Sequence, residues 1–266
     1  MNSVFIAIQL LTRFNLKKVV TLDRASIAAS MAWFPVAGAV QGAVLVLSHL
    51  FFSLFLPAPL VSGLLVAALF LSNGGLHLDG FADTVDSLAG GSTPERRLEI
   101  MKDSSVGAIG AAGLVIILLL KFCAIYALLT HAPDQARFAG LFLFPIVGRW
   151  GMVPVACSLK YARPEGGLGG AFEKNSIRVF LISTFITGVA LSGLLGPWAL
   201  TTLGVVWLFS VGASDFFERR LGGFTGDVLG FVSELAEVIF LISLVAFEKI
   251  YQVGFDALIA SGRAVI

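Results

Sequence analysis

The chain has 266 residues, of which 57% are hydrophobic and 13% are charged, and its mean hydropathy is +0.92. Soluble domains carry about 25% charged residues, so this composition excludes an ordinary soluble globular protein. The formal net charge of +1 provides no basic field, so we expect no nucleic-acid partner. The composition instead predicts an all-α polytopic transmembrane bundle in the lipid bilayer, built as one integral membrane domain over residues 1–266.

About seven apolar stretches are long enough to cross a bilayer as helices. Met1–Leu11 precedes them and is too short and too poor in basic residues for a cleaved signal peptide. We interpret it as an eighth, partial or interfacial helix. The predicted spans cover Ile27–Phe51, Pro59–Leu78, Val106–Leu129, Phe138–Leu159, Ile177–Leu195, Trp198–Val211 and Leu229–Phe247.

The loops between these spans alternate between long, charged, glycine-rich segments and short ones. The long loops are Thr12–Ser26, Asp79–Ser105, Lys160–Ser176 and Ser214–Asp227. Of the 18 Lys and Arg residues, 13 lie in these long loops or within two residues of them. Basic residues gather on the cytoplasmic side of membrane proteins, so the long loops are predicted to be cytoplasmic and to form one site together.

The strongest chemical signal is the run GGLHLDGFADTVD at residues 74–86. Its aspartates Asp79, Asp83 and Asp86 are spaced i, i+4, i+7, which places all three on one face of a helix. Like charges at this spacing repel, and a bound divalent cation would remove that cost. Carboxylate oxygens are preferred ligands of Mg²⁺, so the run predicts a metal site at the end of a span.

Charged residues later in the same loop fit a phosphate site. Arg97, Lys102 and Asp103 place basic groups next to an acidic one. Basic side chains bind phosphate oxygens, and a metal–diphosphate site needs both signs of charge.

A second charged region follows the sixth span. Arg219 and Arg220 precede the run LGGFTGD, and Asp227 and Glu234 lie seven residues apart, on one face of the next helix. Ionisable groups that enter an apolar span are costly and are usually functional. We interpret this helix as a second metal-binding or base-bearing element.

Two other functions fit parts of this pattern. CDP-alcohol phosphotransferases also place an acidic DG motif at a cytoplasmic helix end, but their motif has Arg where this chain has Asp83. A cation transporter would use Asp79, Glu234, Glu237 and Lys121 to line an ion path. The acidic residues cluster toward one membrane face, which favours an enzyme. No P-loop, nucleophile elbow or HExxH motif occurs in the sequence.

These motifs, taken in order along nearly the whole chain, resemble the cobalamin synthase family, also called adenosylcobinamide-GDP ribazoletransferase. The chain departs from the family at Ser105, where a basic residue is usual, and at Ser87, where glycine is usual. The segments that carry the resemblance are residues 11–14, Phe34 with Pro35 and Gly38, residues 74–86, residues 98–107, residues 161–163 with the glycines that follow, and residues 221–227 with Glu234.

The resemblance implies an Mg²⁺-dependent phosphotransferase in the cytoplasmic membrane of a bacterium or archaeon, with its active site facing the cytoplasm. Such an enzyme joins adenosylcobinamide-GDP to α-ribazole or its 5′-phosphate and releases GMP. A homo-oligomer and association with other enzymes of the cobalamin pathway both stay open.

Combining the resemblance with the residue pattern assigns roles within the site. Asp79 and Asp83 are predicted metal ligands, with Asp227 as a third. The attacking hydroxyl needs a proton acceptor, for which Asp86 or Asp103 is the candidate. The residues predicted to bind substrate are Arg97, Lys102, Arg219, Arg220 and Glu234.

Overall fold

The computed structural model describes residues 2–14, 23–163, 165–173 and 176–262. This described part is an all-α bundle without strands, and one isolated bridge joins Tyr161 to Phe224. Residues 15–22, in the middle of the first long loop, lie outside the described part. The helices are α1 (Asn2–Leu11), α2 (Arg24–Ser30), η1 (Met31–Trp33), α3 (Phe34–Phe52), α4 (Ala58–Asn73), α5 (Leu76–Gly90), α6 (Pro94–Ile100), α7 (Ala108–His131), α8 (Asp134–Ser158), η2 (Leu168–Phe172), α9 (Ile177–Leu195), η3 (Pro197–Ala199), α10 (Leu200–Leu221) and α11 (Gly226–Gly262).

The predicted number of spans is confirmed. Within the described part of the chain, six helices are long and apolar enough to cross a membrane, and the bent pair α4 and α5 raises the number to seven if it counts as one span. On the outer helices α7 and α9, large apolar side chains such as Ile116 and Phe185 remain exposed. A layer of lipid would cover such apolar surfaces, so the bundle suits a bilayer.

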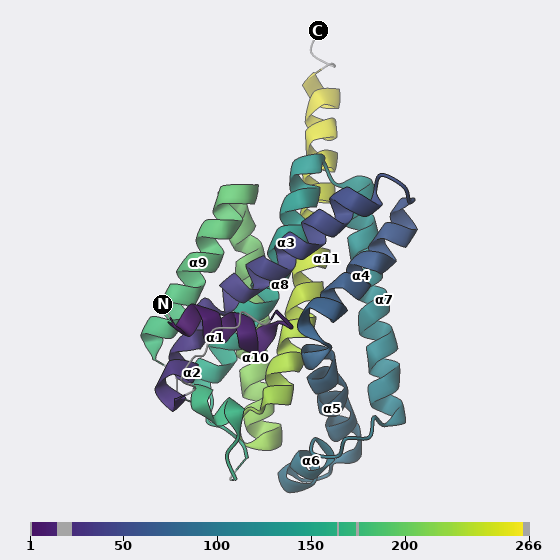
Figure 1. Ribbon diagram of the computed structural model, residues 1–266. Helices are drawn as coiled ribbons and strands as arrows, with labels where there is room; N and C mark the ends of the chain where they lie inside the picture. Colours follow the sequence, from purple (N-terminus) through teal and green to yellow (C-terminus); the bar gives the residue numbers. More distant parts are fainter. Residues whose placement is uncertain (1, 15–22, 164, 174–175, 263–266) are drawn as a thin grey trace.

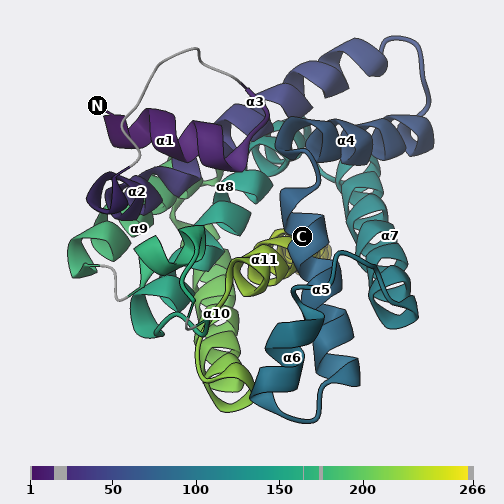
Figure 2. The same cartoon turned by 60° about the horizontal axis from the view of Figure 1, so that its bottom comes forward.

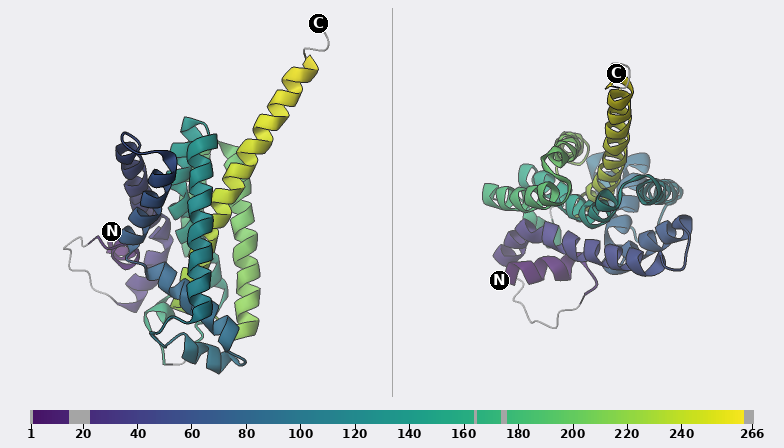
Figure 3. Two further views of the ribbon diagram at one scale, coloured as in Figure 1. Left: turned by 90° about the vertical axis from the view of Figure 1, so that its right-hand side faces the viewer. Right: turned by 90° about the horizontal axis from the view of Figure 1, so that it is seen from above.

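Helix α8 forms the centre of the bundle. It packs against α3, α9, α10 and α11, which lie around it when the molecule is seen from above (Figure 3). Most of its length is buried, including the aromatic side chains Phe144 and Trp150. Helix α11 also crosses the interior, and its C-terminal part extends beyond the ends of the neighbouring helices (Figures 1 and 3).

The second predicted span, Pro59–Leu78, is not straight. Helix α4 ends at Asn73 and α5 begins at Leu76, and the two axes make an angle of 93°. Gly74 and Gly75 lie between them with φ of 68° and 76°, in the left-handed region that only glycine adopts readily. The Gly74 N–H donates to the Phe70 carbonyl and closes α4, as a helix-ending glycine does.

Two predicted loops turn out to contain helix. The segment Asp79–Ser105 holds most of α5 and all of α6, and α10 continues through Ser214 to Leu221. The Thr93 side chain accepts a hydrogen bond from the Arg96 N–H, so it caps the start of α6. A hydropathy window detects only apolar segments, so it assigned these charged helices to loops, although the spacing of Asp79, Asp83 and Asp86 had indicated a helix face.

The remaining long loops meet at one end of the bundle. Helix α6, the segment that contains η2 and the turn between α10 and α11 all lie at the lower end in Figure 1 and come forward in Figure 2. Two backbone hydrogen bonds join the segment that contains η2 to the turn between α10 and α11. The Ala162 N–H donates to the Phe224 carbonyl at 2.8 Å, and the Phe224 N–H donates to the Lys160 carbonyl at 3.0 Å.

Candidate active site

An acidic group forms where α5 packs on α11. Asp79 and Asp83 of α5 and Asp227 of α11 lie within electrostatic range of one another. Gly80 permits this arrangement, because a Cβ atom at this position would lie 2.7 Å from the Cα of Asp227. A side chain there would push the helices apart. The lack of a side chain at Gly80 therefore brings the α11 carboxylate next to the α5 pair.

Arg163 joins this acidic group from the glycine-rich loop. Its Nη2 donates to Asp227 Oδ2 at 2.5 Å, and both side chains are about one-fifth exposed. The Thr225 hydroxyl also donates to Asp227 Oδ2, at 3.3 Å. Arg163 belongs to the segment 161–163 that carries the family resemblance, but no role in the site was predicted for it. Its position next to a run of glycines was the one available signal.

Oxygen donors of the kind Mg²⁺ prefers are present in this group, but they do not form a closed cage. Among the described residues, no three His, Cys, Asp or Glu side chains are arranged to hold a metal ion by themselves. Mg²⁺ usually takes one or two protein carboxylates and completes its shell with water and substrate phosphates. Asp79, Asp83 and Asp227 fit that partial role, and their assignment as metal ligands stays a prediction.

Asp86 has a different environment from the other two aspartates of its motif. Its Oδ2 accepts a hydrogen bond from the Gly107 N–H and its Oδ1 accepts one from the Gly110 N–H, both at 2.7 Å. These N–H groups belong to the start of α7, where a helix leaves its first donors unpaired. The Asp86 carboxylate therefore caps α7, and each of its oxygens already accepts one hydrogen bond.

We expect Asp86→Ala to destabilise the protein by about 1–2 kcal/mol, the usual cost of losing a helix cap. Thermal unfolding in detergent measures this loss. Asp215→Ala is the matched control, since Asp215 also accepts hydrogen bonds but only from an exposed Arg219 one turn away. Equal melting temperatures for the two variants would show that Asp86 does not hold α7.

Asp103, the second predicted base, lies in the loop after α6. Its Oδ1 accepts hydrogen bonds from the Ser105 hydroxyl at 2.6 Å and from the Ser105 N–H at 2.9 Å. These hydrogen bonds, with the hydroxyl as the larger contribution, hold the pKa of Asp103 below its ordinary value. A carboxylate with a lowered pKa is a weaker proton acceptor, so this geometry disfavours Asp103 as the base.

Two of the predicted phosphate-binding residues connect loops at this end of the bundle. Lys102 Nζ donates to Glu165 Oε1 at 2.8 Å, which ties the loop after α6 to the glycine-rich loop. The same hydrogen bond is the main cause of the lowered pKa of Glu165. Arg97 is buried and its Nη1 donates to the Arg220 carbonyl at 3.0 Å, so it fastens α6 to the end of α10.

The remaining arginines lie on the exposed end of α10. Arg219 donates two hydrogen bonds to Asp215, one turn earlier on the same helix. The guanidinium of Arg220 lies 5.4 Å from the centre of the Phe216 ring. Neither side chain contacts the acidic group in this structure, and their binding to a diphosphate stays a prediction.

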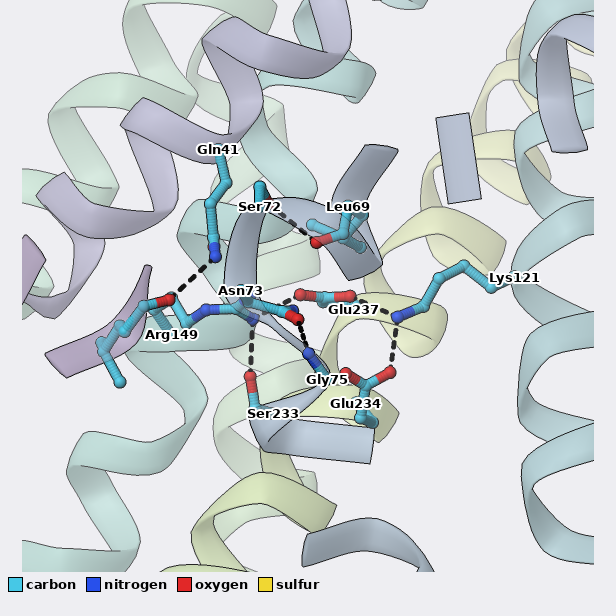
Figure 4. Close-up of polar contacts among 11 residues, drawn as sticks. Gln41, Leu69, Ser72, Asn73, Gly75, Lys121, Arg149, Ser233, Glu234 and Glu237 are labelled. Carbon is cyan, nitrogen blue, oxygen red and sulfur yellow. Dashed lines mark hydrogen bonds and ion pairs between the residues drawn. The ribbon is translucent and has the colours of Figure 1, made fainter. Parts of the chain in front are cut away.

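Glu234 belongs to a buried cluster deeper in the bundle, which Figure 4 shows. Lys121 Nζ lies 2.5 Å from Glu234 Oε2 and 2.6 Å from Glu237 Oε2. Arg149 Nη1 donates to Glu237 Oε1 and, at 2.8 Å, to the Ser233 hydroxyl. Glu234 is 1% exposed, so a substrate could not reach it without breaking this cluster. We therefore remove it from the substrate-binding set.

Comparisons with known proteins identify the family. Residues 3–245 match the family model described as Cobalamin-5-phosphate synthase. A relative from Geotalea daltonii is 39% identical over 246 residues, which are 91% of this chain and 96% of the relative.

Two further relatives agree. One from Desulforamulus reducens is 35% identical and covers 91% of this chain and 96% of its own length. One from Pseudomonas entomophila is 40% identical and covers 81% of this chain and 86% of its own length. All three relatives are named adenosylcobinamide-GDP ribazoletransferase. No solved structure matches the chain. The chain belongs to the cobalamin-5-phosphate synthase family.

Proposed function

We propose that this protein transfers the cobinamide-phosphate group of adenosylcobinamide-GDP to α-ribazole or its 5′-phosphate and releases GMP. The observation that carries the proposal is the match to relatives of that name over nine-tenths of the chain. The acidic group of Asp79, Asp83 and Asp227 supports the proposal, because such carboxylates can hold the divalent cation that offsets the charge of a diphosphate. The motif at residues 74–86 lies on α5, and the motif at residues 221–227 leads into α11; these two helices carry the acidic group.

In the proposed reaction, a ribose hydroxyl oxygen of α-ribazole attacks the phosphorus atom that carries cobinamide. A new P–O bond forms, and the bond from that phosphorus to the bridging oxygen breaks. GMP leaves with the electron pair of the broken bond. The hydroxyl proton is taken up by a carboxylate, and no oxidant or reductant is needed. The protein's task is to align the two oxygens and to offset the negative charge.

Asp79 and Asp83 are the proposed ligands of Mg²⁺, with Asp227 as the third oxygen donor. The donor chemistry fits, because these are hard carboxylate oxygens at the junction of two helices. When bound, Mg²⁺ would neutralise charge on the diphosphate and on the leaving GMP. Without the cation, the three carboxylates would repel the anionic substrate. With the cation bound, the substrate could lie next to them.

The proton acceptor is proposed to come from this same group. Asp86 is hydrogen-bonded to the start of α7 and Asp103 to Ser105, so both predicted bases are already engaged. Arg163, held at Asp227, is well placed to bind a phosphate oxygen as its guanidinium can offer two parallel donors.

We place the site on the cytoplasmic side of the cell membrane. The loops that surround the acidic group lie at the same end of the bundle (Figure 1). The three long loops at this end, residues 79–105, 160–176 and 214–227, hold eight of the chain's 18 Lys and Arg residues, and such clusters favour the cytoplasmic side.

The test is GMP release by the purified protein in detergent or liposomes. With adenosylcobinamide-GDP, α-ribazole and Mg²⁺ present, we expect GMP and a cobalamin product in equal amounts. Omission of α-ribazole should stop GMP release, which separates transfer from hydrolysis. A protein that releases no GMP under these conditions but carries ions across liposomes would contradict the proposal.

A further inference from the structure

A large cavity lies beside the acidic group, between α1, α4, α5 and α7. Its volume is about 890 Å³, near the upper end of the range for small-molecule sites. The apolar part of the wall includes Val66 of α4 and Leu114 and Leu118 of α7. Phe70 and Val106 also line it and are 46% and 52% exposed, so the cavity is open at its rim. Helices α4, α5 and α7 lie next to one another on this side of the bundle (Figures 1 and 2).

The cavity borders the acidic group through α5. Leu78, Asp79 and Ala82 line the cavity, whereas Gly80 packs on α11. Successive residues are rotated by about 100° around a helix, so Asp83 lies between these two faces. Asp79 therefore belongs both to the cavity wall and to the acidic group. A ligand in the cavity would have one end at Asp79.

Polar groups occur at this end of the cavity. Arg13 lines it, and its side chain lies against Gly74, where a Cβ atom would be 2.6 Å from Arg13 Cδ. The Arg13 N–H donates to the Ser72 carbonyl at 2.8 Å, which fixes the backbone at this position. Asn73 also lines the cavity and holds the α4–α5 break, since its Oδ1 accepts from the Gly75 N–H at 2.8 Å. The cavity thus combines apolar walls with a cation and an amide near Asp79.

We propose that this cavity binds the corrinoid part of the nucleotide-activated substrate and places its phosphate at Asp79. This inference rests on the proposed function. The conjugated faces of a corrin ring are apolar and suit the apolar walls, and the amide groups around its edge suit the polar end of the cavity and its open rim. The volume favours the larger of the two substrates, because a single nucleoside would leave most of the cavity unfilled, whereas a corrinoid would fill it and extend past the open rim. The nucleotide half of the substrate then extends from Asp79 toward Arg163.

Two variants that fill the cavity from different helices test this assignment. Ala67→Trp adds an indole ring from α4, and Leu114→Trp adds one from α7. Equilibrium dialysis against adenosylcobinamide, which lacks GDP, measures corrinoid binding by its visible absorbance without any turnover. We expect each variant to raise Kd about tenfold or more. The KM for adenosylcobinamide-GDP should rise similarly, and the KM for α-ribazole should stay at the parent value.

Each variant has a control on the same helix. Leu71→Trp on α4 and Val115→Trp on α7 replace side chains that are 69% and 58% exposed and do not line the cavity. We expect both controls to bind adenosylcobinamide as the parent does. Thermal unfolding shows which cavity variants keep the parent's fold. Corrinoid binding by any one variant that keeps the fold is enough to test whether the corrinoid lies in the cavity.

Three results would overturn the inference. Cavity variants that bind adenosylcobinamide as tightly as their controls would show that the corrinoid lies elsewhere. A rise in KM confined to α-ribazole would assign the cavity to the other substrate. Loss of co-purified phospholipid with unchanged corrinoid binding would make the cavity a lipid site. A parent protein without GMP release would instead count against the proposed function, and the dialysis experiment would still decide where a corrinoid binds.

Discussion

Asp79→Asn and Asp83→Asn should each lower turnover by about 10²–10³-fold, the loss typical of removing one group that stabilises transition-state charge. Asparagine keeps the size of aspartate and one acceptor oxygen, but it lacks the charge that attracts a hard cation. At least one of the two variants should therefore also need more Mg²⁺ for half-maximal rate. Initial rates of GMP release over a range of Mg²⁺ concentrations measure both effects.

Neither variant should be less stable than the parent without metal. The two carboxylates are one helical turn apart, and removing such a like-charge pair relieves about 0.2–0.5 kcal/mol of repulsion. Asp134→Asn is the control, because Asp134 forms its ion pair with Arg137 at the other end of the bundle. An Asp79→Asn, Asp83→Asn double variant that is fully active, with the parent's Mg²⁺ dependence, would disprove the metal assignment.

The number and approximate positions of the spans could be predicted from sequence because burial in lipid requires long apolar runs. The break within the second span could not. Hydropathy averages over a window, and Gly74 and Gly75 read as two neutral residues in an apolar stretch. Their positive φ values depend on the surrounding packing, including Arg13 against Gly74. The same averaging ended the predicted span at Leu78 and assigned the rest of α5 to a loop, although the spacing of its aspartates indicated a helix face.

The candidate site could likewise be predicted from the sequence only in part. The spacing of Asp79 and Asp83 is local, so the sequence alone could place both on one helix face. The approach of Asp227 depends on the close contact at Gly80, and a helix contact between residues 80 and 227 has no local signature. For the same reason the capping role of Asp86 and the Arg163–Asp227 pair could not be foreseen. A carboxylate's task depends on which donors the fold brings to it, and these donors are distant in sequence.

The buried cluster also bears on the transporter alternative. That hypothesis required Glu234, Glu237 and Lys121 to line an ion path. In the structure these side chains are at most 2% exposed, and two carboxylates are balanced by Lys121 and Arg149. A balanced, sealed cluster offers no net negative charge to attract a cation. Its geometry instead joins three helices, since Lys121 lies on α7, Arg149 on α8 and the glutamates on α11.

Lys121→Met should destabilise the protein by about 3–5 kcal/mol, because removing one member of a buried ion pair leaves its partner uncompensated. Here two glutamates would remain with Arg149 alone in a low-dielectric interior. Adding Glu234→Met should restore much of the loss, since the remaining Arg149–Glu237 pair is balanced. Thermal or denaturant unfolding in a fixed detergent compares the three proteins.

Lys102→Met is the matched control, because Lys102 forms an ion pair of similar length with Glu165 but both side chains are about half exposed. Exposed ion pairs contribute little, so its melting temperature should stay near that of the parent. A Lys121→Met protein as stable as this control would show that the cluster does not hold α7 to α11.

If the cluster does hold them, Lys121→Met should also slow GMP release at temperatures at which the variant is still folded. The reason is that α11 also carries Asp227, which lies two helical turns from Glu234 and belongs to the acidic group. The Glu234→Met second change should then restore the rate along with the stability, which a substrate-binding role for Glu234 would not allow.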